Sequence, residues 1–257
     1  MVEADIVPRL LMAHQSGPAP MPAQRDAASI DASTVSHFVS AVLGTDDAAP
    51  AALVQTLLGD GHAVETLYLE LLAPAARELG QRWEDDECSF VDVTVAMGRL
   101  HRVLRDLSES FQSEGDGVPR SGHVLLTCLP GEQHTLGLIM VAEFLIRDGF
   151  RVHVGSPWAE ADLLDLIRRE WFDVVGFSAG CDSRLSTLKR EITRLRAASC
   201  NPHLQVLVGG QVFSLDAKLV ERVGADGWAR DAASSPETVR ALCAAAARLA
   251  SQSGTSA

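Results

Sequence analysis

The sequence predicts an α/β fold with a doubly wound, five-stranded parallel sheet, preceded by an all-α part of four helices. Two observations support this. Apolar residues recur at three- and four-residue steps from position 31 to about position 112, as on the buried faces of helices. After position 122, apolar runs that suit buried strands alternate with helical patterns, which is typical of parallel sheets.

Four amphipathic helices are expected in the first part. Two short ones cover 32–43 and 50–58, and two longer ones cover 63–83 and 89–111. Short connections between them indicate a small bundle. The residues expected on the buried faces of the two longer helices are Val64, Leu67, Tyr68, Leu71 and Leu72 in the third, and Phe90, Val93, Met97, Leu100, Leu104 and Leu107 in the fourth.

Five β-α units are expected in the second part. Strands are predicted over 123–129, 151–155, 173–179, 204–210 and 226–229, and helices over 136–148, 160–170, 184–198, 214–223 and 236–250. No hairpin signal separates the strands, so we expect a flavodoxin-like fold with strand order 2-1-3-4-5.

Composition suggests where the domains begin and end. Residues 1–30 are rich in Pro, Ala and Ser and are expected to form a flexible tail. The four-helix cap is expected over 31–112, a linker over 113–121, the flavodoxin-like domain over 122–250 and a second tail over 251–257.

Charge, hydropathy and cysteine content narrow the function classes. Lys and Arg total 22 against 34 Asp and Glu, a formal net charge of −12, so direct DNA binding is not expected. The apolar runs are far shorter than the roughly 20 residues that span a bilayer, and no signal peptide is recognisable. Five cysteines without a C-x-x-C pair fit a reducing compartment. We therefore expect a cytoplasmic protein without membrane contact.

Unusual residues follow strands 1, 3 and 4. The segment 130–137 reads PGEQHTLG after the first strand, Ser178 to Gly180 close the third, and Gly209 and Gly210 close the fourth. Ligands of a doubly wound sheet bind outside the carboxyl ends of the strands, here between strands 1 and 3. The sequence therefore predicts a ligand site at this edge.

Several common chemistries lack their residues at this edge. Leu129 and Ser178 stand where a receiver domain has acidic residues, and the segment after strand 1 is not a Gly-rich nucleotide turn. The stretch from Gly176 to Gly180 matches G-x-S-x-G by letters, but no helix is expected directly after Ser178 and His203 is poorly placed for a hydrolase. No catalytic residue is assigned.

His134 is the candidate metal ligand. Glu132 can accept its second ring N–H, which fixes the tautomer of a metal-bound histidine and raises its basicity. One histidine cannot hold a bare zinc ion, but it suffices as an axial ligand when a macrocycle supplies four others. The pattern therefore indicates a tetrapyrrole-like cofactor, with a loop histidine without a ligand as the alternative.

These residues resemble the cobalamin-binding domain family. Its motif is Asp-x-His-x-x-Gly, Ser-x-Leu and Gly-Gly at the ends of strands 1, 3 and 4 of a flavodoxin-like fold. The motif here reads Glu132-x-His134-x-x-Gly137, Ser178-x-Gly180 and Gly209-Gly210. Family members commonly have a four-helix cap with a tryptophan near the end of its third helix, where Trp83 stands. The resemblance covers about residues 33–250.

The resemblance implies a cobalamin site between cap and sheet. His134 would be the lower cobalt ligand, supported by Glu132, and Trp83 would cover the upper face of the corrin. The nucleotide tail would pass Ser178 and the two glycines of strand 4. The full set of binding candidates is Trp83, Glu132, Gln133, His134, Thr135, Gly137, Ser178, Gly180, Gly209 and Gly210. Alternatives are an ordinary strand-ending turn at the glycine pair and a core residue at Trp83.

Three positions depart from the family pattern. Glu132 replaces Asp, and Gly180 replaces the Leu after Ser. Val93 and Thr94 stand where photoreceptor members have a Glu-His pair that serves the upper cobalt face. His101, two turns further on, is a conceivable substitute, although we favour a histidine on a solvated face. Hydroxocobalamin is therefore expected to bind at least as well as adenosylcobalamin.

The sequence most resembles the AerR/PpaA family in three features. These are the glutamate in the motif, the Pro-rich first residues and the lack of a recognisable DNA-binding module. Members of this family are cobalamin-binding regulators of photosynthesis genes. The resemblance implies a light-responsive antirepressor without enzymatic activity, whose partner is a PpsR/CrtJ-type repressor. Alternatives are a corrinoid methyl-carrier subunit of a methyltransferase system, a haem-binding sensor on the same fold, and a scaffold that has lost its cofactor.

Overall fold

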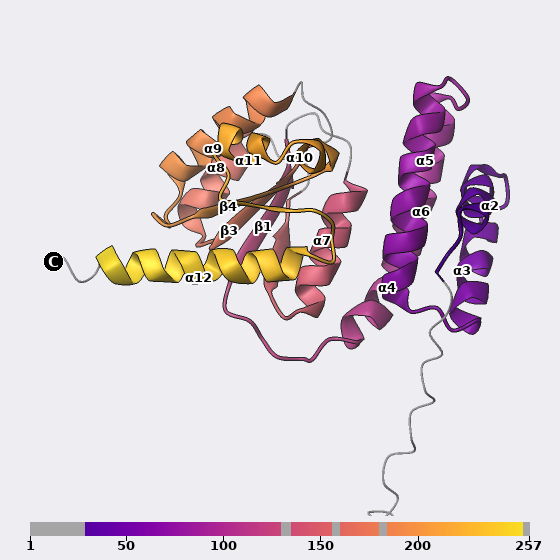
Figure 1. Cartoon of the computed structure of the whole chain (residues 1–257), viewed down its shortest axis with the longest axis horizontal. Coiled ribbons are helices and arrows are strands. Elements are labelled where there is room, and N and C mark those ends of the chain that lie inside the picture. Colours follow the sequence, from indigo (N-terminus) through magenta and orange to yellow (C-terminus); the bar gives the residue numbers. More distant parts are fainter. Residues whose placement is uncertain (1–28, 130–134, 156–159, 180–183, 254–257) are drawn as a thin grey trace, which may run out of the picture.

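The computed structural model describes residues 29–129, 135–155, 160–179 and 184–253. Its helical part begins with α2 (Ala32–Leu43) and α3 (Ala49–Gly59). A continuous helical stretch runs through α4 (Val64–Thr66), the π-helical η1 (Leu67–Leu72) and α5 (Ala73–Glu84), and α6 (Phe90–Ser113) returns beside it (Figure 1). The predicted four-helix arrangement is confirmed, and every residue expected on the buried face of the third helix is buried.

Side-chain caps set where the helices begin. Asp31 accepts a hydrogen bond from the backbone N–H of Thr34 at 2.8 Å and caps α2. Ser89 and Asp92 cap α6 reciprocally, since each side chain accepts from the other's backbone N–H. Such caps stabilise a helix by about 1 kcal/mol each because they satisfy otherwise unpaired N–H groups. The hydrogen bonds from Ser89 also lower the pKa of Asp92.

Pro74 accounts for the π-helical segment. A proline inside a helix has no N–H to donate, and its ring clashes with the carbonyl four residues earlier, here that of Glu70. The turn before it is widened, so that the N–H of Ala73 reaches back to the carbonyl of Tyr68. The same segment carries the buried Tyr68, whose hydroxyl donates to the carbonyl of Leu104 at 3.1 Å.

The second part is a parallel sheet in the order β2-β1-β3-β4-β5, which confirms the predicted fold class and topology. Its strands are β1 (His123–Cys128), β2 (Arg151–Val154), β3 (Val174–Ser178), β4 (Gln205–Gly209) and β5 (Gly227–Ala229). The helices are α7 (Leu136–Arg147), α8 (Glu160–Arg169), α9 (Leu185–Ala198), α10 (Gln211–Leu215), α11 (Lys218–Val223) and α12 (Ser235–Ser253). The exact domain boundaries stay a prediction.

The single helix predicted over 214–223 was wrong. Asp216 is extended, with φ −144° and ψ 98°, and it ends α10. Its carboxylate then accepts from the backbone N–H of Lys218 at 3.0 Å, at the start of α11. A short polar side chain that bonds to nearby backbone competes with helix continuation, which explains the break.

The helices of the second part cover the two faces of the sheet. Residues of α8, α9, α10 and α11 share one core with the sheet, and residues of α7 and α12 share another. Figure 1 shows α12 crossing in front of the strands and α7 on the side nearest the helical part. Because strands covered on both faces need apolar side chains on both, their continuous apolar runs are explained.

Helix α7 belongs to the cores of both parts. Leu138, Ala142 and Leu145 pack against the sheet. Leu136, Met140 and Phe144, on its other side, belong to the core of the helical part. A helix that is apolar around most of its surface is buried between two partners, and α7 therefore joins the two parts through continuous packing.

Aromatic and charged groups reinforce this junction. The ring of Phe111 lies 4.6 Å from Tyr68 and 4.9 Å from Phe144. The guanidinium of Arg147 lies 4.1 Å from the Phe111 centroid and pairs with Glu65 at 2.8 Å. Burial, and then the charge of the buried Glu143, raises the pKa of Tyr68. The junction thus combines ring packing with an ion pair that is partly shielded from water.

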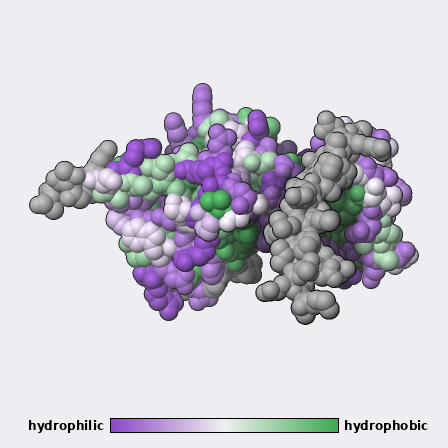
Figure 2. Space-filling view, turned by 90° about the horizontal axis from the view of Figure 1, so that it is seen from below, coloured by the Kyte–Doolittle hydropathy of each residue, from purple (hydrophilic) through white to green (hydrophobic). Residues whose placement is uncertain are grey.

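The surface is mainly hydrophilic where the α/β part is viewed from below, with smaller hydrophobic groups between (Figure 2). Within the described segments, no helix combines the length and apolar character that a membrane crossing requires.

We expect Phe144→Ala to lower the free energy of unfolding by about 3–5 kcal/mol, because it removes a buried ring and leaves a cavity. Ile146→Ala on the same helix is the control: its side chain is 36% exposed, so a loss of about 1 kcal/mol is expected. Urea denaturation of both variants measures the difference. Equal losses would contradict the role assigned to α7.

Candidate functional site

Three strands end level with one another at the predicted edge. In the sheet register, Ser178 of β3 pairs with Cys128 of β1 on one side and with Gly209 of β4 on the other. Ser178 and Gly209 are half-buried, whereas Cys128 is buried. The structure therefore brings the predicted residues of strands 3 and 4 side by side, next to the end of strand 1.

The two adjacent glycines at the end of β4, Gly209 and Gly210, are explained by different features of the structure. Gly210 has φ +112°, and a Cβ built on it would lie 2.1 Å from the carbonyl oxygen of Ala179. The close approach of its own chain therefore requires this glycine. A Cβ on Gly209 would meet only the carbonyl oxygen of Ala229, at 3.6 Å, an ordinary contact. The alternative of a strand-ending turn is therefore sufficient to explain Gly210. At Gly209, the missing side chain leaves room for a ligand at the edge of the sheet.

Helix α7 begins at this edge with two predicted site residues. Thr135 precedes its first turn, and Gly137 is exposed, with open space where a Cβ would stand. The other predicted residues of this group, Glu132, Gln133 and His134, lie outside the described residues, as does Gly180 after β3. Their proposed roles stay predictions.

His101 on α6 contacts the start of α7, so its placement on a solvated face was wrong. The residue is half-buried. Its Nδ1 lies 2.8 Å from the carbonyl oxygen of Met97, which can only accept, so Nδ1 carries the proton of the neutral ring. Nε2 then accepts from the hydroxyl of Thr135 at 3.2 Å. Sequence reasoning missed this contact because it depends on how α6 packs against α7.

The helical part exposes large apolar side chains at the end formed by α5 and α6. Trp83 is 51% exposed, which excludes the alternative of a core residue. Phe90 was expected on the buried face of its helix, and this was wrong, since it is 64% exposed. Val91 and Val95 are exposed nearby on α6. Because soluble proteins rarely leave such groups uncovered together, this end is suited to contact a ligand or partner.

Helical spacing relates this apolar end to the sheet edge. Phe90, Thr94 and His101 are four and seven residues apart, so they lie on one side of α6. Phe90 stands three turns, or roughly 16 Å, beyond the contact between His101 and Thr135. In Figure 1 the turn between α5 and α6 lies toward the same end of the molecule as α10, which follows β4. The apolar side chains and the strand ends thus share one end of the molecule.

The described residues fit a large apolar cofactor held at this end. Gly209 and Gly137 leave space where side chains would otherwise stand. Trp83 and Phe90 offer uncovered apolar surface. In the described part of the chain, no three His, Cys, Asp or Glu side chains gather as a metal site.

Comparison with known proteins identifies the family. A B12 binding domain model matches residues 122–236, and a second B12 binding domain model matches residues 36–107. An uncharacterised 20.5 kDa protein from the bchF-crtJ intergenic region of Rhodobacter capsulatus is 31% identical over 163 residues, which are 63% of this chain and 84% of that protein. The chain belongs to the B12-binding domain family.

One further relative of this B12-binding chain and one solved structure are informative. The HTH-type transcriptional repressor CarH of Myxococcus xanthus is 29% identical over 170 residues, 63% of this chain and 54% of the repressor, so the match spans about half of the repressor's length. The monomethylamine corrinoid protein of Methanosarcina barkeri has a similar structure, with a TM-score of 0.67, 17% identity, and coverage of 82% of this chain and 97% of that one. The last similarity shows a shared fold.

The adjacent glycines give a matched pair of variants of the B12-binding domain. Gly210→Ala is expected to lower the free energy of unfolding by more than about 2 kcal/mol, because its φ is positive and its Cβ would overlap Ala179. Gly209→Ala is expected to change stability by less than about 1 kcal/mol but to weaken hydroxocobalamin binding, because its methyl group enters the space at the edge. Denaturant melts and absorbance titrations separate the two effects. Unchanged binding by Gly209→Ala would place the cofactor elsewhere.

Proposed function

We propose that this chain is a cytoplasmic, light-responsive cobalamin-binding regulator without enzymatic activity, acting on a protein partner. One observation carries the proposal: α7 starts shortly after position 134 and belongs to the core of the helical part. A ligand held at that start therefore acts on the helical part through one packed helix. Coupling of this kind serves a sensor, which must change its surface when the ligand changes.

His134 is proposed as the lower cobalt ligand, with Glu132 accepting its second ring N–H. Cobalamin, when bound, supplies a cobalt ion whose upper ligand can be exchanged by light. Residues of this chain would position the cofactor and shield it from water. Thr135 holds the start of α7 against His101, and Trp83 and Phe90 exclude water from the upper side. The α5–α6 end would then move between two arrangements that bind the cofactor with different affinity.

The proposed partner is a PpsR/CrtJ-type repressor, and the proposed role is that of an antirepressor in photosynthesis gene control. The relative from Rhodobacter capsulatus comes from the bchF-crtJ intergenic region, which supports this choice of partner. The similarity to the repressor CarH supports a regulatory role. The net charge of −12 supports action through a protein and not through direct DNA binding.

A corrinoid methyl-carrier is the second candidate function. It is favoured by the shared fold with the monomethylamine corrinoid protein. A carrier must let its cobalt accept and release methyl groups repeatedly, whereas a sensor only exchanges its upper ligand. Repeated methyl transfer by the reduced, cobalamin-loaded chain with a methyl donor and a partner methyltransferase would replace the regulatory proposal. A haem-binding sensor is a further alternative, which the absorption spectrum of the loaded protein distinguishes from a corrinoid protein.

His134→Ala is expected to abolish the retention of hydroxocobalamin through gel filtration, because it removes the proposed cobalt ligand. Glu132→Ala is expected to weaken binding about 10–100-fold, since it removes only the support of that ligand. His37→Ala, at an exposed histidine of α2, is the control and should bind normally. Retention by His134→Ala with an unchanged spectrum would refute the assignment of this ligand.

Hydroxocobalamin is expected to bind at least as tightly as adenosylcobalamin in the dark. Val93 and Thr94 offer no imidazole to the upper face, and the Nε2 of His101 already accepts from Thr135, so none of these three residues presents a free imidazole nitrogen to replace a departing adenosyl group. Titration of the cofactor-free chain with both compounds measures the preference. Much tighter adenosylcobalamin binding, followed by ligation of His101 after illumination, would overturn this expectation.

A further inference from the structure

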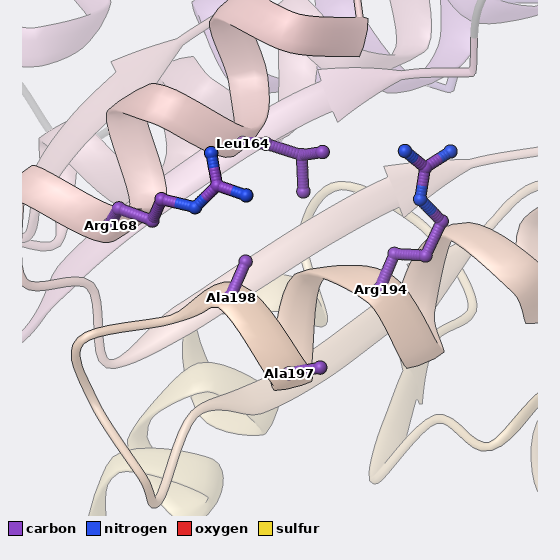
Figure 3. A pocket seen from close by; sticks show the side chains of 5 residues that line it. All are labelled: Leu164, Arg168, Arg194, Ala197 and Ala198. Atoms are coloured by element: carbon purple, nitrogen blue, oxygen red, sulfur yellow. The ribbon is translucent and has the colours of Figure 1, made fainter.

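An open groove between α8 and α9 lies on the face of the sheet away from α7. Its volume is about 360 Å³, and it is lined by Leu164, Arg168, Arg194, Ala197 and Ala198. Figure 3 shows the guanidinium groups of Arg168, from α8, and Arg194, from α9, on either side of the Leu164 side chain. The groove thus has a small apolar floor between two cationic groups.

Among its charged side chains, helix α9 exposes only positive ones to solvent. Lys189, Arg190, Arg194 and Arg196 are exposed, whereas its single acidic residue, Glu191, is buried. This surface contrasts with the formal net charge of −12 of the whole chain. Arg196 is paired with Asp226 at 2.6 Å, and the facing helix α8 exposes Asp162 and Asp165 beside Arg168, so the excess of positive charge lies on α9. Such a local positive surface on an otherwise acidic protein attracts and orients an acidic partner.

The two arginines are held in place by carboxylates of the same chain. Arg168 donates to Asp165 at 2.9 Å, and Arg194 lies 3.7 Å from the buried Glu191. A guanidinium has five N–H donors and can bind more than one anion at the same time. Their spacing across an apolar floor suits two carboxylates of one peptide with an apolar side chain between them.

The position of the groove connects it with the cofactor edge. Along the chain, α8 is the element after β2, and α9 is the element after β3. Both helices therefore start at the edge where the cofactor is proposed to bind, while the groove lies in their later turns. A partner in the groove contacts the same helices without covering the apolar end formed by α5 and α6.

We propose that the α8–α9 groove is a docking surface for an acidic, leucine-containing segment of a partner protein. This inference rests on the proposed function, because it supplies the surface through which the regulator meets its partner. Charge complementarity selects the occupant. A polyanion such as DNA is disfavoured by the long-range repulsion of the acidic chain, whereas a short acidic segment meets mainly the local positive field.

The test uses the full chain, loaded with hydroxocobalamin or free of it, and a fluorescein-labelled peptide of Glu-Glu-Leu repeats. Fluorescence anisotropy should show binding at least about ten-fold tighter than to a matched Gln-Gln-Leu peptide, and weaker binding at high salt. The double variant R168E/R194E should lose about ten-fold or more in affinity. R248E, on α12 across the sheet, is the control for charge reversal and should bind as the parent does.

Two outcomes would overturn the docking proposal. One is equal binding of the Glu and Gln peptides, or equal effects of R168E/R194E and R248E. The other is arginine-dependent binding of single-stranded DNA or phosphatidylserine vesicles that is tighter than binding of the acidic peptide. Titration of R168E/R194E with hydroxocobalamin distinguishes this proposal from the proposed function. Normal cofactor binding together with lost peptide binding supports the docking groove. Failure of the parent chain to bind the cofactor would contradict the proposed function alone.

Discussion

The burial of α7 on both of its sides is the constraint on which the rest of the structure depends. One side packs on the sheet and the other enters the core of the helical part, where Phe144 meets Phe111. Since interiors are close-packed, a shift of this helix cannot be absorbed by empty space and must be passed to its neighbours. The start of α7 is therefore mechanically linked to α6, and the hydrogen bond between Thr135 and His101 adds a direct contact at that point.

Cofactor binding and the transmission of its effect to the helical part therefore involve different parts of the structure. The strand ends that carry Ser178 and Gly209 form a rigid row, because each is fixed by its neighbours in the sheet. At the end formed by α5 and α6, the apolar side chains lie exposed and therefore make fewer packing contacts. A cofactor placed between a rigid edge and a less constrained apolar end can select among arrangements of that end. The cationic groove on α8 and α9 lies apart from both, so a partner and a cofactor need not compete.

Much of this arrangement was predictable from the sequence, because strong periodicity reports burial. The continuous apolar runs predicted the parallel sheet, and the pattern of the third helix predicted its buried residues. Individual predictions were wrong at positions where the sequence pattern along one helix does not report contacts with other parts of the chain. Phe90 fits the apolar stripe of its helix but lies beyond the last neighbour that would cover it, and His101 looks solvated until α7 is placed against it. The break at Asp216 depends on one side-chain hydrogen bond, which periodicity does not report.

Hydrogen–deuterium exchange of the chain with and without hydroxocobalamin tests the coupling through α7 most directly. Amide exchange reports local opening, so a ligand that holds the start of α7 should slow exchange there and in the facing turns of α6 around His101. The account predicts slower exchange in both helices together, and little change in α11, which packs on the opposite face of the sheet. Protection confined to the strand ends, with α6 and α7 unchanged, would contradict it.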